Sequence, residues 1–264
     1  MFSVTYAQLN GWLTAFLWPF VRILALLATA PVLSHMAIPT RVKIALGAFI
    51  TLIVAPTLPA MPQTTVFSAA GIWIIVNQFL IGAAIGMTMQ IAFAAVDAAG
   101  EFIGQQMGLG FAMLYDPREG GNAVVISRYL NTLAMLAFLV FDGHLQLISA
   151  LVTTFQNVPI EANVVAAASH AQGWRVLVGY GTSIFGTGLL LSLPIVAALL
   201  ISNLALGILN RAAPQIGIFQ VGFPVTMLVG LLLLQLMLPN LMPFFLRIFD
   251  AGIAQVGRVA GALY

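Results

Sequence analysis

The sequence has no cysteine and very little charge. Without cysteine the chain can form no disulfide, no thiolate metal site and no cysteine nucleophile. Charged residues make up 6% of its 264 positions, against about 25% in an ordinary soluble domain. Nine Lys and Arg and seven Asp and Glu cannot cover the surface of a soluble fold of this length. A soluble domain is therefore excluded, and a net charge of +2 is too small to indicate nucleic-acid binding.

The sequence also lacks the common motifs of catalysis and cofactor binding. It contains no HExxH zinc motif, no GxSxG nucleophile elbow, no P-loop and no GxGxxG dinucleotide loop. Its histidines, His35, His144 and His170, are too far apart for metal-ligand spacing. We therefore expect no catalytic residue, no metal site and no cofactor, and the chain is predicted not to be an enzyme.

Long apolar runs are what the sequence does have, with 61% hydrophobic residues. A helix needs about 20 apolar residues to cross the hydrocarbon core of a bilayer. The runs predict an all-α membrane protein of about six long apolar helices in one integral-membrane domain, residues 1–264. The helices are expected near residues 9–33, 44–58, 66–96, 129–152, 176–209 and 224–246, with a polar region at 97–128 and an amphipathic tail at 247–264. Pro194 is expected to interrupt the fifth helix.

Glycines recur four residues apart in and beside these runs. They are Gly82 and Gly86; Gly100, Gly104 and Gly108; and Gly257 and Gly261. In lipid, small residues let helix backbones approach closely, although glycine is also simply common in membrane helices. The middle series lies beside Asp97 and Glu101, so this helix should face water, a pore or another subunit rather than lipid.

Polar side chains interrupt two of the apolar runs. Arg22 lies well inside the first, where it either snorkels to an interface or pairs with an acid in a partner. Asp142 and His144 flank Gly143 in the fourth. They either belong to a proton relay or, as we favour, mark a turn at Gly143 between two helices, with Asp142 capping the second.

The most unusual stretch is residues 108–122, which read GLGFAMLYDPREGGN. The dipeptides at 116–117 and 120–121, Asp-Pro and Gly-Gly, forbid a continuous helix, yet the centre of the stretch is apolar. Irregular backbone at membrane depth survives only inside protein or lining a cavity. The segment is therefore either a closure element for a pore or an ordinary buried loop, and the residues alone favour the loop.

Three stretches carry a family resemblance. Residues 108–117 read GLGFAMLYDP, residues 141–148 read FDGHLQLI, and residues 204–226 read LALGILNRAAPQIGIFQVGFPVT. The second is similar to the pattern FxGHLxLI and the third to LALGLLNRxAPQxxIF. In this order, and over about half the chain, they resemble the FliR family, flagellar biosynthesis proteins of the type III export apparatus with injectisome counterparts in the SctT family.

The resemblance implies a core component of the flagellar type III protein export gate, in the bacterial inner membrane and the flagellar basal body. One copy of the chain would join P-type and Q-type subunits around a pore for unfolded flagellar proteins, among other export-apparatus membrane proteins and membrane lipid. The helices would form bent hairpins, and an irregular loop would plug the pore. The loop residues are Gly108, Leu109, Gly110, Phe111, Ala112, Met113, Leu114, Tyr115, Asp116 and Pro117.

Other residues are assigned to packing and assembly. They are Arg22, Asp97, Glu101, Asp142, Gly143, His144, Asn210, Arg211, Pro214 and Gln215. In the family's assembly, the first three would find partners in neighbouring chains. The turn at 210–215 should fix how two hairpins pack, with Pro214 ending a helix and Arg211 capping carbonyls or meeting an acid. The alternatives are a multi-pass secondary transporter for a small solute, which predicts an inverted repeat that we do not find, and a purely structural membrane assembly factor.

Overall fold

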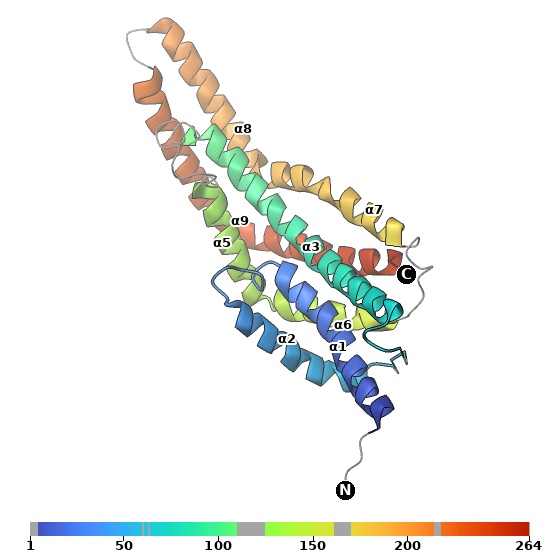
Figure 1. Ribbon diagram of the computed structural model, residues 1–264. Coiled ribbons are helices and arrows are strands. Elements are labelled where there is room, and N and C mark those ends of the chain that lie inside the picture. Colours follow the sequence, from blue (N-terminus) through green and yellow to red (C-terminus); the bar gives the residue numbers. More distant parts are fainter. Residues whose placement is uncertain are drawn as a thin grey trace. The chain divides into compact units, whose positions relative to one another are not determined.

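The computed structural model describes residues 5–59, 61–62, 64–109, 125–160, 170–213 and 218–263. Within these ranges all regular structure is helical (Figure 1). The helices are α1 (Tyr6–Thr29), α2 (Thr40–Val54), the 3₁₀ turn η1 (Ala55–Thr57), α3 (Ala69–Gln106), α5 (Val125–Val140), α6 (Gly143–Asn157), α7 (His170–Gly181), α8 (Ser183–Ala212) and α9 (Ile218–Ala262). The prediction of an all-helical chain is confirmed for this part of the protein.

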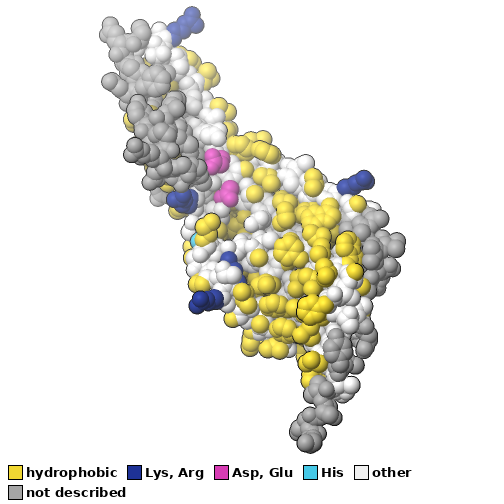
Figure 2. All heavy atoms as spheres, viewed as in Figure 1, with side chains coloured by type: hydrophobic (Ala, Val, Ile, Leu, Met, Phe, Trp, Pro, Cys, Tyr) yellow, Lys and Arg dark blue, Asp and Glu magenta, His cyan; other side chains and the backbone are white. Residues whose placement is uncertain are grey.

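Many of these helices are long and apolar enough to cross a membrane. Among the described residues, five candidate spans meet that condition, and the bent pair formed by α5 and α6 adds a sixth if it is counted as one span. Hydrophobic side chains cover much of the face drawn in Figure 2, where basic groups stand apart from one another. Phe49 of α2 is 62% exposed and Ile201 of α8 is 70% exposed. Apolar surface on this scale needs lipid or protein cover, so the chain is a multi-pass membrane protein.

The chain divides into two compact units, which we call the first and second unit. The first comprises residues 1–91, 142–181 and 249–264, and therefore holds α1, α2, α6, α7, the start of α3 and the end of α9. The second comprises residues 92–141 and 182–248, and holds α5, α8, the end of α3 and most of α9. Both α3 and α9 are continuous from one unit into the other.

Several helix boundaries differ from the expected ones. Helix α3 continues to Gln106, into the expected polar region, and α9 continues to Ala262 with no separate tail. Pro194 lies inside α8 without ending it, because neighbouring groups in a membrane protein can satisfy the backbone that proline frees. The break comes instead at Thr182, directly after Gly181, where the lack of a side chain weakens the helix.

Two of the paired glycines in the first unit allow α1 and α3 to touch. A Cβ atom at Gly82 would overlap the backbone carbonyl of Arg22, and one at Gly86 would overlap the side chain of Thr29. Only glycine permits such an approach without moving a helix. The interpretation of this pair as a packing motif is confirmed.

Glycines also allow close packing of helices in the second unit. A Cβ at Gly100 of α3 would overlap the backbone of Ser127 of α5, and one at Gly188 of α8 would lie 2.9 Å from the carbonyl oxygen of Ala95. By contrast, Gly257 and Gly261 of α9, in the first unit, have no neighbouring atom within 4 Å among the described residues. Four-residue glycine spacing therefore marks close packing at two of the three places where it occurs.

Candidate functional site

A buried polar group with several partners in the first unit is the guanidinium of Arg22. Its side chain is fully buried. Nε donates to Oε1 of Gln78 on α3 at 2.7 Å, Nη1 to Oγ1 of Thr154 on α6 at 3.2 Å, and Nη2 to the carbonyl of Val158 at 3.0 Å. The Phe155 ring lies against the cation, with 4.3 Å between Cζ and the ring centroid. Arg22 thus joins three helices of this unit.

This arrangement differs from the expectation that Arg22 snorkels, whereas its contact with an acid of another subunit stays a prediction. The side chain does not snorkel, and among the described residues its partners are neutral groups of its own chain. Thr154 lies in the last turn of α6 and Val158 is its C-cap, where the helix macrodipole places partial negative charge. The aromatic face adds further attraction for a desolvated cation. The end of α6 therefore supplies partial negative charge to Arg22 within the chain.

Asp97 of α3 also finds its partners within the chain. In the second unit, Nδ2 of Asn131 donates to Oδ1 of Asp97, and the Ser127 hydroxyl lies 3.0 Å from the carbonyl oxygen of Asp97 and 3.4 Å from its Oδ1. The close approach at Gly100 brings α5 near enough for these bonds. Glu101, one turn further along, is half-buried and is not a free carboxylate. Asp97 is therefore bound within its own chain by α5, and a partner for it in a neighbouring chain stays a prediction.

The segment at 141–144 is a break between helices, as predicted. Asp142 is the N-cap of α6, but it adopts the left-handed conformation at φ 55° and its side chain makes no capping hydrogen bond. Asp142 therefore occupies the expected cap position, but its side chain does not cap α6. The left-handed residue of this turn is Asp142 and not Gly143. Nδ1 of His144 is buried without a hydrogen-bond partner among the described residues. No bond between Asp142 and His144 supports a relay.

The turn after α8, residues 210–215, is only partly within the described residues. Asn210 and Arg211 are exposed in the last turn of α8, and no bond from Arg211 to a carbonyl or an acid occurs in the described part of the chain. A cation near a helix C-terminus is favourable in itself. Pro214 and Gln215 lie outside the described residues, so their assigned roles stay predictions.

The proposed plug loop begins where α3 ends. Met107 and Gly108 continue the last turn of α3 through hydrogen bonds to Ile103 and Gln105. Gly108 has φ +81°, a conformation that favours glycine. Gly108 and Leu109 are therefore placed, whereas residues 110–117 lie outside the described residues.

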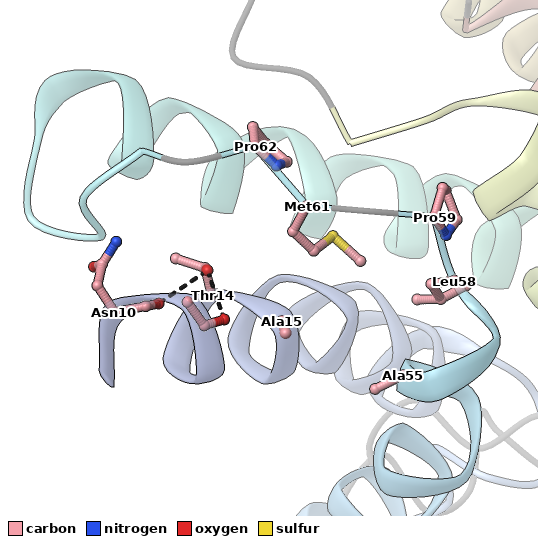
Figure 3. Close-up of a pocket in the computed structure, with 9 residues that line it drawn as sticks. Asn10, Thr14, Ala15, Ala55, Leu58, Pro59, Met61 and Pro62 are labelled. Carbon is pink, nitrogen blue, oxygen red and sulfur yellow. Dashed lines mark hydrogen bonds between the residues drawn. The ribbon is translucent and has the colours of Figure 1, made fainter. Parts of the chain in front are cut away.

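A pocket of about 270 Å³ lies beside the start of α1 (Figure 3). Asn10 and Thr14 of α1 line it together with Met61 and Pro62. The Thr14 hydroxyl bonds the carbonyls of Asn10 and Gly11, and the Asn10 amide bonds the carbonyl of Thr64. Because these polar groups already have partners and no charged residue lines the pocket, we assign no ligand to it. The described residues also contain no cluster of three or more metal-ligating side chains.

The chain is similar to known bacterial export proteins along most of its length. The family model described as "Bacterial export proteins, family 1" matches residues 13–252. The flagellar biosynthetic protein FliR of Pectobacterium carotovorum subsp. carotovorum is 53% identical over 244 residues, which cover 91% of this chain and 92% of that protein.

Two further relatives carry the same name. The FliR protein of Escherichia coli (strain K12) is 47% identical over 250 residues, covering 95% of this chain and 94% of the relative. That of Bacillus subtilis (strain 168) is 28% identical over 220 residues, covering 83% and 84%. The family match therefore includes all or part of every helix described above.

Proposed function

From the premise that this chain belongs to the FliR family, within family 1 of the bacterial export proteins, we propose that it is a core subunit of the flagellar type III export gate in the inner membrane. It is a multi-pass membrane component of flagellar protein export. One copy joins P-type and Q-type subunits and contacts other export-apparatus membrane proteins and lipid. Unfolded flagellar proteins pass through the channel that the subunits enclose, and the chain itself catalyses no reaction.

The family match over residues 13–252 carries this proposal. It covers α2 to α8 entirely and most of α1 and α9. The exposed apolar faces of α2 and α8 support it as well, because subunits of a membrane assembly cover such faces with one another or with lipid. We treat residues 1–264 as one export domain, since α3 and α9 run without interruption from one compact unit into the other.

The loop at 108–117 acts as the plug of the resting channel. The positive φ of Gly108 turns the chain out of α3, and Phe111, Met113, Leu114 and Tyr115 then supply bulk without charge. A constriction lined by apolar side chains blocks ions by dewetting. A flexible methionine lets such a constriction give way to a passing polypeptide.

Deletion of residues 111–115 tests this function. The variant and the intact chain are each co-expressed with the P-type and Q-type subunits, and co-purification measures assembly. Potassium flux is then recorded from proteoliposomes that contain equal amounts of assembled complex. The deletion should assemble normally and raise the flux. A complex that assembles but conducts no more than the intact one would show that the loop is no plug and would leave a structural role in assembly.

A further inference from the structure

The end of α3 packs against one face of α9 within the second unit (Figure 1). The residues of α9 that make this contact are Phe223, Thr226 and Gly230. Their spacing of three and four residues places them on one side of the helix. Directly after α3 they meet Met107 and Gly108, and Gly108 is the first residue of the proposed plug loop. One helix face thus contacts the loop at its starting point.

The contact to Thr226 satisfies a carbonyl that the helix end leaves free. The last carbonyls of an α-helix have no partner within the helix. The Thr226 hydroxyl is buried and lies 3.3 Å from the carbonyl oxygen of Met107 and 3.1 Å from that of Phe223 in its own helix. A hydroxyl has one proton to donate, so the two carbonyls share it. The bond to Met107 joins residues 119 positions apart in the sequence.

Close side-chain packing also holds Met107 and Gly108 in place. The Met107 side chain is fully buried and occupies the space that a side chain at position 230 would need. A Cβ atom at Gly230 would lie 2.6 Å from Cγ and 2.8 Å from Sδ of Met107. The ring of Phe223 lies 3.1 Å from the Cβ position of Gly108, which itself has φ +81°. Met107 and Gly108 therefore have little freedom to move unless α9 moves with them.

We propose that Phe223, Thr226 and Gly230 form a latch that holds Met107 and Gly108 and so positions the start of the plug loop. This inference rests on the proposed function of the loop. The three residues are positioning residues, because they act on the plug through Met107 and Gly108. The latch assigns a specific role to the FPVT sequence at 223–226, which the family pattern alone leaves unexplained.

A spin label at the first position beyond the latch measures the effect directly. The chain has no cysteine, so Leu109→Cys provides a single attachment site once cysteines of the partner subunits are replaced. In the assembled complex, Thr226→Val removes the hydroxyl at constant shape and Phe223→Ala removes the ring. Both should increase label mobility at position 109, and Thr226→Ser should restore the mobility of the parent complex.

Two variants of the same unit serve as matched controls. Thr132→Val is the control for Thr226→Val, because it removes a hydroxyl that bonds only within α5. Gly186→Ala is the control for a further latch variant, Gly230→Ala. It adds a methyl group in α8 with no neighbour within 4 Å, whereas Gly230→Ala fills the space that Met107 occupies. The controls should leave mobility and potassium flux unchanged. Each latch variant should raise the flux per assembled complex at least threefold, toward the value of the 111–115 deletion.

The outcomes separate the latch from the plug. If label mobility at position 109 does not change in Thr226→Val, the latch does not exist, and this conservative variant decides the question even if Phe223→Ala fails to assemble. Increased mobility without increased flux, in a complex where the deletion leaks, overturns any effect of the latch on the plug and leaves the plug intact. A deletion that does not leak overturns the proposed function, while the mobility measurement still decides whether α9 positions the start of the loop.

Discussion

The hydrogen bond between Arg22 and Gln78 allows a sharp test of how this protein accommodates a buried cation. Gln78 is almost fully buried, and its Oε1 is the acceptor for Nε of Arg22 at 2.7 Å. Gln78→Leu keeps the cation in place and removes that acceptor. Arg22→Met removes the cation and leaves the amide without its donor. The double variant removes both partners.

The expected energies follow from the partners that each change leaves behind. A hydrogen bond to a charged group contributes about 1.5–3 kcal/mol, so Gln78→Leu should destabilise the protein by about that amount. In the Arg22→Met background the amide of Gln78 has lost its bond, and replacing it with Leu should be nearly neutral. The two changes should therefore be coupled by about 2 kcal/mol, within the range found for contacting residues.

Chemical unfolding of the purified protein in detergent micelles, followed by circular dichroism, measures this cycle. Gln235→Leu is the control, because Gln235 is an exposed glutamine of α9, and its replacement should change stability by less than about 0.5 kcal/mol. If the double variant is as unstable as the sum of the two single variants, the side chains do not stabilise each other. The account of Arg22 given above would then be wrong.

Three further results are expected. Gly86→Leu should prevent α1 from packing on α3 and sharply lower the yield of monodisperse protein in size-exclusion chromatography. The control Gly257→Leu should not lower this yield, and equal yields would contradict the packing role of Gly86. Asn131→Leu should destabilise the protein by about 1.5–3 kcal/mol in the same unfolding assay because Asp97 loses a hydrogen bond, and an unchanged midpoint would refute that contact's importance. Arg211→Leu should reduce co-purification with the P-type and Q-type subunits more than it changes flux per assembled complex, and normal assembly would rule out its role in packing.

Apolar runs predict the helical class well because the length and composition of a membrane span are properties of a single segment. The glycine pair at 82 and 86 is predictable for the same reason, since its spacing alone places both residues on one helix face. Helix boundaries are less predictable. The acids that suggest an end of α3 at Val96 are accommodated inside the helix, because Asn131 and Ser127 of another helix bind Asp97.

The partners of polar residues depend on tertiary structure and cannot be inferred from local sequence. Arg22 binds groups that are 56, 132 and 136 residues away along the chain. Nothing near Arg22 identifies Gln78 or the end of α6 as its acceptors. The contact of Thr226 with Met107 joins residues 119 positions apart, although the family pattern that includes Thr226 does draw attention to that segment.

The sequence distance between Arg22 and Val158 also has a consequence for biosynthesis. A ribosome adds about 5–20 residues per second, so the 136 residues that separate them take roughly 7 to 30 seconds to make. Throughout that interval α1 carries a cation whose final acceptors on α6 have not yet been synthesised. During insertion Arg22 must remain near water or lipid headgroups, as a snorkelling side chain does. Helix α1 therefore reaches its final position only after α6 has been synthesised.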